Sequence, residues 1–435
     1  MQSLALPMIG VGVGLVAIVA AIWWRDRKRG PQPPDPHPEV PTLRVVALGL
    51  EGAGKTVLLA SQFHKLSEPV SDRRYFLDDD WEQDRQLARI YASVSDTSAP
   101  WPPATRIGNT HTFRFDCRAR DRAGHERTLF RISYLDYAGD LLELGPDDGT
   151  GELLEPRRSE QAKVKDLTAK FNDADALLVI VDGRRVLQLL RNEDEAHDYF
   201  DGRLRPLLGE ARRATCPVQL ILTKWDLVRS FDDSGDEELL RQVKGRLMSY
   251  SRVLGLVQAH CQRQEEVRLI PVSAVGPRFV EVQADGRVVK RPDGQLDPIN
   301  IDVPLCAVLP DMLKHAEQSL DQSVRYDLEQ EIGRHHVGDV ASIVRSVLSS
   351  PAGRLVQSAL SGVVGDEIVR LFVELLVRSK SPDAEPPRDH RDEQRPHRDD
   401  EEETRRLRAE VLKDMNRVVD RLEYRLPSSV LCSRW

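Results

Sequence analysis

Runs of mainly apolar residues along the chain predict a sheet that is buried on both faces. Such runs cover Val45–Leu48, Ala176–Val181, Val218–Leu222 and Val267–Val272, and each is followed by glycine or polar residues. Runs of this kind are typical of strands in parallel sheets, whose carboxyl ends meet at one edge. The pattern therefore predicts an α/β fold with a mostly parallel sheet.

Other stretches alternate or repeat with helical spacing. Apolar residues recur at helical spacing over Thr56–Leu66 and, inside an insertion rich in Asp, Ser and Pro, over Trp81–Tyr91. His111–Arg120 and Arg127–Leu135 alternate around a polar turn and predict a β-hairpin. A smaller hairpin is predicted over Phe279–Val289. These elements make the predicted sheet a mixed one.

The carboxyl-terminal part is predicted to be mainly helical. A helix over Asp302–Gln322 closes the core domain, and a helical extension follows. Ser381–Glu403 is a run of mixed charge that cannot bury a core, so we expect it to be disordered. The amphipathic helix predicted over Thr404–Tyr424 either folds back on the domain or binds a partner.

The amino-terminal segment has the composition of a membrane anchor. Leu4–Trp24 contains no charged side chain, and a helix of about 20 such residues spans the hydrocarbon region. Trp23 and Trp24 precede the basic run Arg25–Arg29, which predicts that the amino terminus lies outside and the rest in the cytoplasm. A cleaved signal peptide is the alternative, but Met1–Ser3 lacks the usual basic start. We expect a single-pass membrane protein.

These patterns divide the chain into consecutive segments. Gly10 and Gly14 form a small-xxx-small pair in the anchor, which leaves a homodimer open. The segments are an anchor at 1–25, a basic and Pro-rich tether at 26–42, a core domain with insertions at 43–315, a helical extension at 316–380, a charged linker at 381–403, and an amphipathic helix with a tail at 404–435.

Composition narrows the partners and the compartment. Lys and Arg number 62 against 70 Asp and Glu, and the net charge of −8 gives no overall basic field for nucleic acid. The five cysteines lie far apart and form no C-x-x-C pair. We therefore expect no nucleic-acid partner, reduced thiols and a cytosolic compartment.

The run Leu43–Thr56, LRVVALGLEGAGKT, carries the first candidate site. Gly49, Gly54, Lys55 and Thr56 fit the pattern G-x-x-x-x-G-K-[ST] directly after a predicted strand. Glycines let backbone N–H groups surround a triphosphate, Lys55 supplies a charge, and Thr56 supplies a hydroxyl for Mg²⁺. A glycine turn that caps a helix is the alternative. The loop residues expected at the phosphates are Gly49, Glu51, Gly52, Ala53, Gly54, Lys55 and Thr56.

Three further motifs follow apolar runs. Asp136 is placed to hold Mg²⁺, and Gly139 is placed to present its N–H to a γ-phosphate. Thr223–Asp226, TKWD, and the pair Ser273–Ala274 follow two later runs. Because all these runs are predicted in one parallel sheet, we expect the motifs to converge on the glycine-rich loop.

GLEGAGKT, DYAG, TKWD and SAV occur in the order found in translation-factor-class (TRAFAC) P-loop GTPases, and the chain resembles that class from Leu43 to about Leu313. The resemblance implies GTP or GDP with Mg²⁺ as ligands. Asp226 would accept hydrogen bonds from guanine, Lys224 would lie against the base, and Thr223 replaces the commoner Asn. The implied base-binding residues are Thr223, Lys224, Asp226, Ser273 and Ala274.

The loop also looks like that of Arf-like GTPases and the β subunit of the signal-recognition-particle receptor. The long insertions are similar to those of larger bacterial membrane-associated GTPases of the double-GTPase type. Pro103–Asn109 resembles an Arf-type first switch, which implies Thr105 as a second hydroxyl for Mg²⁺, with Thr97 and Thr110 as alternatives. The implied metal ligands are Thr56, Thr105 and Asp136.

One departure from the GTPase pattern bears on rate. Many GTPases place Gln after D-x-x-G to orient the attacking water, whereas this chain has Asp140. Glu51 adds a second acid near the γ-phosphate, so we expect slow hydrolysis of GTP to GDP and phosphate. The candidate catalytic residues are Lys55, Thr105 and Asp140.

These motifs and the anchor predict a membrane-anchored cytoplasmic GTP-binding switch with an effector or an activating protein as its partner. Two alternatives stay open. One is a GTP-bound scaffold that does not hydrolyse its nucleotide, and the other is an ATPase with the same loop.

Overall fold

The computed structural model describes most of the chain after the predicted tether. Thr105, Gly139, Asp140 and the predicted anchor lie outside the described residues. Among the helices that are described, none combines the length and the apolar character needed to span a bilayer. The described ranges are 40–79, 81–103, 111–138, 169–283, 287–334, 340–361, 363–380 and 395–432.

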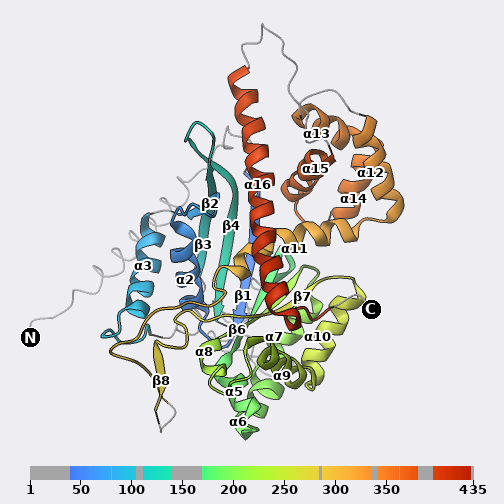
Figure 1. Cartoon of the computed structure of the whole chain (residues 1–435). Helices are drawn as coiled ribbons and strands as arrows, with labels where there is room; N and C mark the ends of the chain where they lie inside the picture. Colours follow the sequence, from blue (N-terminus) through green and yellow to red (C-terminus); the bar gives the residue numbers. More distant parts are fainter. Residues whose placement is uncertain are drawn as a thin grey trace, which may run out of the picture. The chain divides into compact units, whose positions relative to one another are not determined.

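The described residues form a seven-stranded sheet in the order β2-β3-β4-β1-β5-β6-β7 (Figure 1). Neighbours from β4 to β7 are parallel, and β3 runs antiparallel to both β2 and β4. The predicted mostly parallel α/β sheet is therefore confirmed. The strands are β1 (Thr42–Gly49), β2 (Tyr75–Asp78), β3 (His111–Arg120), β4 (Glu126–Ala138), β5 (Ala176–Asp182), β6 (Val218–Thr223) and β7 (Val267–Pro271).

The register aligns the carboxyl ends of the parallel strands. Gly49, the last residue of β1, pairs with Ala138, the last residue of β4. Asp182 at the end of β5 pairs with Thr223 at the end of β6. The predicted motifs therefore leave the sheet at one level, because the polar residue that ends each apolar run is the first that the core does not need to bury.

Two strands differ from the sequence prediction. β2 lies in the segment predicted as an insertion with one helix, and it is a short edge strand that buries Tyr75 and Leu77. β4 continues through Asp136 to Ala138, so Asp136 lies within the strand and not after it. The extension arises because the Leu48 and Gly49 backbone of β1 continues to pair with β4 up to Ala138.

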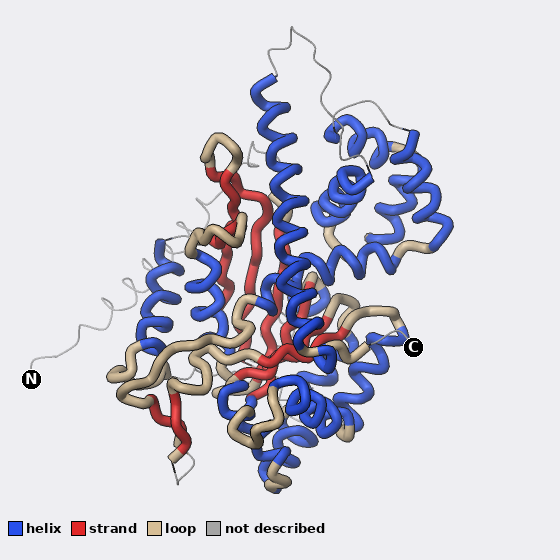
Figure 2. The backbone as a smooth tube through the Cα atoms, in the orientation of Figure 1, coloured by secondary structure: helices blue, strands red, loops and turns tan. Residues whose placement is uncertain are grey.

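Helices flank the sheet and its loops (Figure 2). Helix α2 packs beside α3, as Figure 1 shows, and α3 confirms the helix predicted in the insertion. The helices of the amino-terminal half and centre are α2 (Lys55–Ser67), α3 (Trp81–Ser95), α5 (Gly183–Leu190), α6 (Asp194–His197), the π-helix Asp198–Arg203, α7 (Arg205–Arg213), α8 (Trp225–Val228), α9 (Asp236–Met248) and α10 (Ser251–Gln262).

The remaining elements follow β7. The predicted small hairpin is present as β8 (Val280–Val282) and β9 (Val288–Lys290), which pair antiparallel. The predicted closing helix is α11 (Val303–Ser319). The helical extension consists of α12 (Gln322–Arg334), α13 (Val340–Ser349), α14 (Pro351–Leu360) and α15 (Asp366–Lys380), and the predicted amphipathic helix is α16 (Arg395–Arg425), which the 3₁₀ turn Pro427–Ser429 follows.

Helix α16 folds back on the core, which was one of the two predicted outcomes. It packs against α11 and β4, and it buries Leu407, Val411 and Met415. The helix begins at Arg395, whereas Thr404 was predicted, so part of the predicted charged linker is helical. Ion pairs along the helix, such as Arg406 with Glu410, favour this longer helix even though its first residues are charged.

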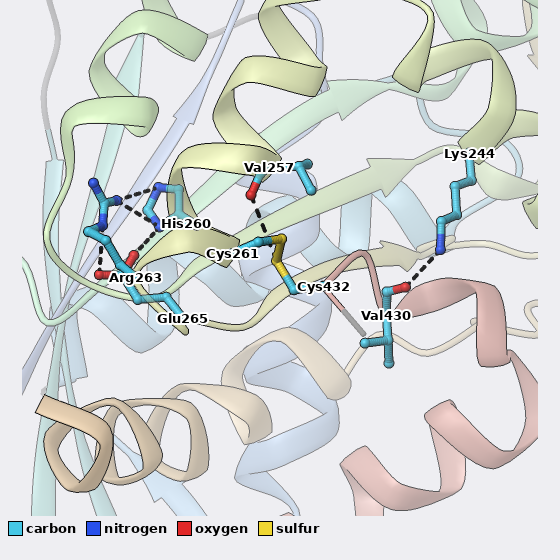
Figure 3. The surroundings of a disulfide bond; sticks show 8 residues. All are labelled: Lys244, Val257, His260, Cys261, Arg263, Glu265, Val430 and Cys432. Carbon is cyan, nitrogen blue, oxygen red and sulfur yellow. Dashed lines mark hydrogen bonds and ion pairs between the residues drawn. A yellow bond between two sulfur atoms is a disulfide. The ribbon is translucent and has the colours of Figure 1, made fainter. Parts of the chain in front are cut away.

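The expectation that all cysteines are reduced is wrong for two of them. Cys261 at the end of α10 and Cys432 in the tail form a disulfide, as Figure 3 shows, across a sequence separation of 171 residues. A cross-link that closes so long a loop stabilises a fold by about 2 to 4 kcal/mol. Among the described residues, the cysteines that remain free and buried are Cys117, Cys216 and Cys306.

The disulfide holds the tail against the edge of the sheet. The Leu431 N–H donates to the Val267 carbonyl at 2.9 Å, and Val430 forms an antiparallel bridge with Arg268. Lys244 donates to the Val430 carbonyl at 2.8 Å (Figure 3). The tail thus satisfies backbone groups at the edge strand β7 that would otherwise be open to another chain.

Candidate functional site

A cavity of about 750 Å³ lies where the predicted motifs leave the sheet. Its lining comes from the glycine-rich loop, from the ends of β4 and β6, and from the residues after β7. The insertion and the β8–β9 hairpin supply the opposite wall. Cavities of this size hold ligands of the dimensions of a nucleotide.

The loop between β1 and α2 supplies one end of the cavity. Gly52 and Gly54 have φ values of 75° and 88°, a left-handed backbone that glycine adopts without strain. Helix α2 begins at Lys55, so its positive amino end faces the loop. Lys55 is 5% exposed, and its ammonium donates to the carbonyls of Gly49 at 2.8 Å and Leu50 at 3.0 Å. This arrangement places buried positive charge at the cavity, as an anionic ligand requires.

Thr56 and Asp136 form the second feature of the cavity. The Thr56 hydroxyl donates to Asp136 Oδ2 at 2.7 Å, while the buried Oδ1 atom has no hydrogen-bond partner among the described residues. Burial raises the pKa of Asp136, and the hydrogen bond from Thr56 and the charge of Lys55 oppose that rise. A buried carboxylate oxygen without a partner indicates that a cation or a donor belongs beside it.

These donors fit magnesium. A hydroxyl and one carboxylate are hard oxygen ligands, and Mg²⁺ takes few protein ligands where phosphates and water supply the others. Among the described residues no group of three or more His, Cys, Asp or Glu gathers at one point. Thr56 and Asp136 would hold the ion, and it would neutralise phosphate charge when bound.

Thr223 and Lys224 connect the opposite side of the cavity to the loop. The Thr223 hydroxyl is within hydrogen-bonding distance of the Ala53 carbonyl, at 2.7 Å, and of the Val181 carbonyl, at 3.2 Å. The Lys224 ammonium donates to the Gly52 carbonyl at 2.8 Å and pairs with Asp182 at 2.8 Å. The two motifs therefore form one connected surface, in which the hydroxyl of Thr223 binds a loop carbonyl.

Asp226 and Ser273 define the remaining wall. The Ser273 hydroxyl donates to Asp226 Oδ1 at 2.5 Å and accepts a bond from the Gly276 N–H at 2.8 Å. Burial raises the pKa of Asp226, and the Ser273 hydrogen bond opposes the rise. One carboxylate oxygen is thus fixed, and the Asp226 side chain lines the cavity as a hydrogen-bond acceptor of defined orientation.

The structure brings together most of the residues predicted for the site. Gly49, Ala53 and Ser273 stand behind the lining and support it through the contacts given above. Thr97 is not among the described residues that line the cavity, and its hydroxyl donates to the Pro292 carbonyl at 3.4 Å. The predicted residues that line the cavity are Glu51, Gly52, Gly54, Lys55, Thr56, Asp136, Thr223, Lys224, Asp226 and Ala274.

Several contributors were missed by the sequence motifs. Asp182 pairs with Lys224, and a Cβ atom on Gly183 would lie 2.1 Å from the Thr223 carbonyl, so only glycine fits there. Asp182-Gly183 at a strand end was the available signal. Trp101, Val288 and Val289 line the cavity without belonging to any motif.

Comparisons by sequence and comparisons by structure give different results for this chain. No family model matches the chain, and no curated protein sequence matches it. Among solved structures, a bacterial selenocysteine-specific elongation factor EF-Sec is 13% identical with a TM-score of 0.24, over 54% of this chain and 26% of that one. Elongation factor SelB from Methanococcus maripaludis, in complex with the GTP analogue GppNHp, is 13% identical with a TM-score of 0.25, over 55% and 31%.

Sup35 complexed with GMPPNP is 16% identical with a TM-score of 0.27, over 57% of this chain and 41% of that one. The chain thus spans between about a quarter and two fifths of these proteins. The fold class follows from the chain's own features. The mixed, mostly parallel sheet and the loop between β1 and α2 fit the P-loop NTPase fold.

Proposed function

We propose that this protein binds GTP and Mg²⁺ in the cavity at the sheet edge and acts as a slowly hydrolysing nucleotide switch. The observation that carries the proposal is the pairing, in one cavity, of the buried Lys55 with the oriented carboxylate of Asp226. The first suits a triphosphate, and the second suits a base edge with hydrogen-bond donors.

Asp226 supports guanine over adenine. Guanine presents an N–H and an amino group side by side, and both are donors that match the two oxygens of a carboxylate. Adenine presents an acceptor nitrogen at the corresponding edge, so a fixed carboxylate would face it with like polarity. Ser273 strengthens this choice, because its hydroxyl prevents the Asp226 carboxylate from turning away.

Replacing Asp226 by Asn tests the base. Xanthine has a carbonyl where guanine has the amino group, so an amide side chain matches xanthine better. We expect Asp226→Asn in the full chain to lower GTP affinity by about 10- to 100-fold, as loss of charge-assisted hydrogen bonds predicts, and to raise XTP affinity. Equilibrium binding of GTP, ATP and XTP measures the change.

The matched control is Asp236→Asn. The Asp236 carboxylate accepts a hydrogen bond at 3.0 Å from the indole N–H of Trp225, the residue before Asp226, and it does not line the cavity among the described residues. The control should keep the base preference of the wild-type protein. A wild-type protein that prefers ATP to GTP would establish the alternative of a P-loop ATPase.

We expect hydrolysis to be slow. Glu51 is exposed and lines the cavity, so it adds negative charge where charge stabilisation is needed. Single-turnover phosphate release from the full chain should proceed on the order of 10⁻³ per second or slower. Release at a rate of about 1 per second or more would contradict this prediction, and GTP retained indefinitely would favour the scaffold.

We also propose a single membrane span over Leu4–Trp24, with the amino terminus outside and the nucleotide domain in the cytoplasm. The support is the uncharged run followed by tryptophans and the basic run Arg25–Arg29. The proposal includes an effector or activating protein that reads the bound nucleotide, with a homodimer through the anchor left open. Loss of the full chain from membranes on alkaline extraction would contradict the span.

A further inference from the structure

The β8–β9 hairpin and the end of α3 meet at a joint, and the side chain of Lys290 makes the first of its contacts. Lys290, the last residue of β9, donates through its ammonium to the carbonyls of Ser93, Asp96 and Ala99, at 2.8 Å for Asp96 and 3.0 Å for Ala99. These carbonyls lie at and just beyond the end of α3, where backbone acceptors lack intrahelical partners. Lys290 therefore caps α3 from another part of the chain, where a positive charge is favoured.

Trp101 makes a second connection across the same joint. Its indole N–H donates to the Val288 carbonyl at 3.1 Å, and the Lys290 ammonium lies 4.7 Å from the centre of its ring. Val288 and Lys290 are half-buried in the joint, and burial lowers the pKa of Lys290. We call this set the α3–hairpin clamp. It consists of Ser93, Asp96, Ala99, Trp101, Val288 and Lys290.

The clamp borders one wall of the cavity, and two of its members line that wall. Trp101 and Pro102 line the cavity from one side of the joint, and Val288 and Val289 line it from the other. Lys290 is not among the described residues that line the cavity, so any effect on a ligand must pass through these neighbours. These four residues belong neither to the glycine-rich loop nor to the seven-stranded sheet.

The same joint is packed onto the base-binding motifs. A small hydrophobic cluster contains Val94 of α3 together with Leu227, Val275 and Val280, and Trp101 and Val288 pack against it. Leu227 follows Asp226 in the chain, and Val275 follows Ala274. Movement of the clamp would therefore disturb the wall and the packing beside Asp226 at once.

We propose that Lys290 is a positioning residue that holds this wall closed and sets how long the nucleotide stays bound. The inference rests on the proposed GTP binding and adds a determinant that no nucleotide-binding motif contains. The reason is kinetic. A ligand enclosed by this wall dissociates only when the wall moves, and the clamp connects Trp101 and Pro102 on one side of the wall to Val288 and Val289 on the other. Lys290 should therefore act mainly on dissociation.

The test is release of nucleotide from the full chain carrying Lys290→Met. Fluorescently labelled GDP and GTP are displaced by excess unlabelled nucleotide with Mg²⁺ present, and association is measured separately. We expect dissociation to be about tenfold faster, association to change by less than about threefold, and the preference for GTP over ATP to be kept. Lys290→Arg, which keeps the cation, should lie closer to the wild-type protein.

The matched control is Lys244→Met. Lys244 also has its pKa lowered by burial and also donates to a backbone carbonyl, that of Val430, but it belongs to the tail contact. It should release nucleotide at the wild-type rate. If Lys290→Met does not melt cooperatively, Trp101→Phe decides, because it removes the indole donor to Val288 and reduces the ring beside Lys290 while it keeps an aromatic side chain at the wall.

The outcomes separate this inference from the proposed function. A wild-type protein that binds no GTP would remove the proposed function itself. A wild-type protein that binds GTP, together with folded Lys290 and Trp101 variants that release it at an unchanged rate, would overturn the positioning role alone. Equal acceleration by Lys244→Met would also overturn it, since the effect would then be general destabilisation.

Discussion

Replacing Lys55 by Met is expected to abolish tight triphosphate binding while leaving the fold intact. Lys55 is 5% exposed, and its ammonium donates to two carbonyls of its own loop, so it is a buried cation at the mouth of the cavity. Removing one partner of a buried charged pair costs about 3 to 5 kcal/mol, which corresponds to a loss of about 10²- to 5 × 10³-fold in affinity. Titration of GTP into the full chain with Mg²⁺ measures the loss.

Lys65→Met is the matched control for this substitution. Lys65 lies in the last turn of the same helix and pairs with Asp302 at 2.9 Å, on the surface. The control removes the same charge from α2 and should change GTP affinity by less than about threefold, since surface ion pairs contribute little. Affinity within about threefold of wild type for Lys55→Met would show that the loop does not hold phosphates.

The strands of the sheet were predictable because each carries its own signal. Ala176–Val181 is a continuous apolar run and Val218–Leu222 is an apolar run with one polar residue, Gln219, and both are buried strands in the structure. β2 lacked such a signal, since Tyr75–Asp78 is short and stands beside acidic residues. Its place is decided by pairing with β3 and by the burial of Tyr75, whose hydroxyl meets Cys306 at 3.0 Å. Those contacts join residues that are far apart in the sequence, so no local pattern indicates them.

The disulfide shows the same limit. Cys261 and Cys432 carry no spacing that would indicate a pair, because their approach depends on the tail crossing the edge of β7. The residues of the candidate site also divide into those that the sequence predicts and those that it does not. Lys55, Asp136 and Asp226 belong to local motifs and were predictable, whereas Lys290 acts on α3 from 194 residues away, through backbone carbonyls that carry no residue signature.

Asp136→Asn should uncouple magnesium from nucleotide and at the same time stabilise the protein without its ligands. Asp136 is 3% exposed, and its Oδ1 atom is buried without a hydrogen-bond partner among the described residues, so the hydrogen bond from Thr56 and the charge of Lys55 compensate the buried carboxylate only in part. A neutral amide removes most of that cost, and we expect about 1 to 2 kcal/mol of added stability. Thermal unfolding without nucleotide or Mg²⁺ measures this gain.

The same substitution removes the carboxylate that a divalent cation requires. In the wild-type protein Mg²⁺ and GTP should each strengthen binding of the other by about 5- to 150-fold, the usual range for coupled sites. In Asp136→Asn that factor should fall to near one, as measured by GTP titration with and without Mg²⁺. Coupling retained at the wild-type level would show that the ion is held elsewhere.

Asp311→Asn provides a control with the opposite sign in stability. Asp311 is equally buried, but it is paired with Arg268, which lies next to Glu423 as well. Removing this carboxylate leaves part of a buried charge unpaired, so we expect a loss of up to about 3 kcal/mol with the magnesium coupling unchanged. One chemical change would therefore stabilise the fold at Asp136 and destabilise it at Asp311, because of these two carboxylates only Asp136 keeps a buried oxygen without a partner among the described residues until a cation binds.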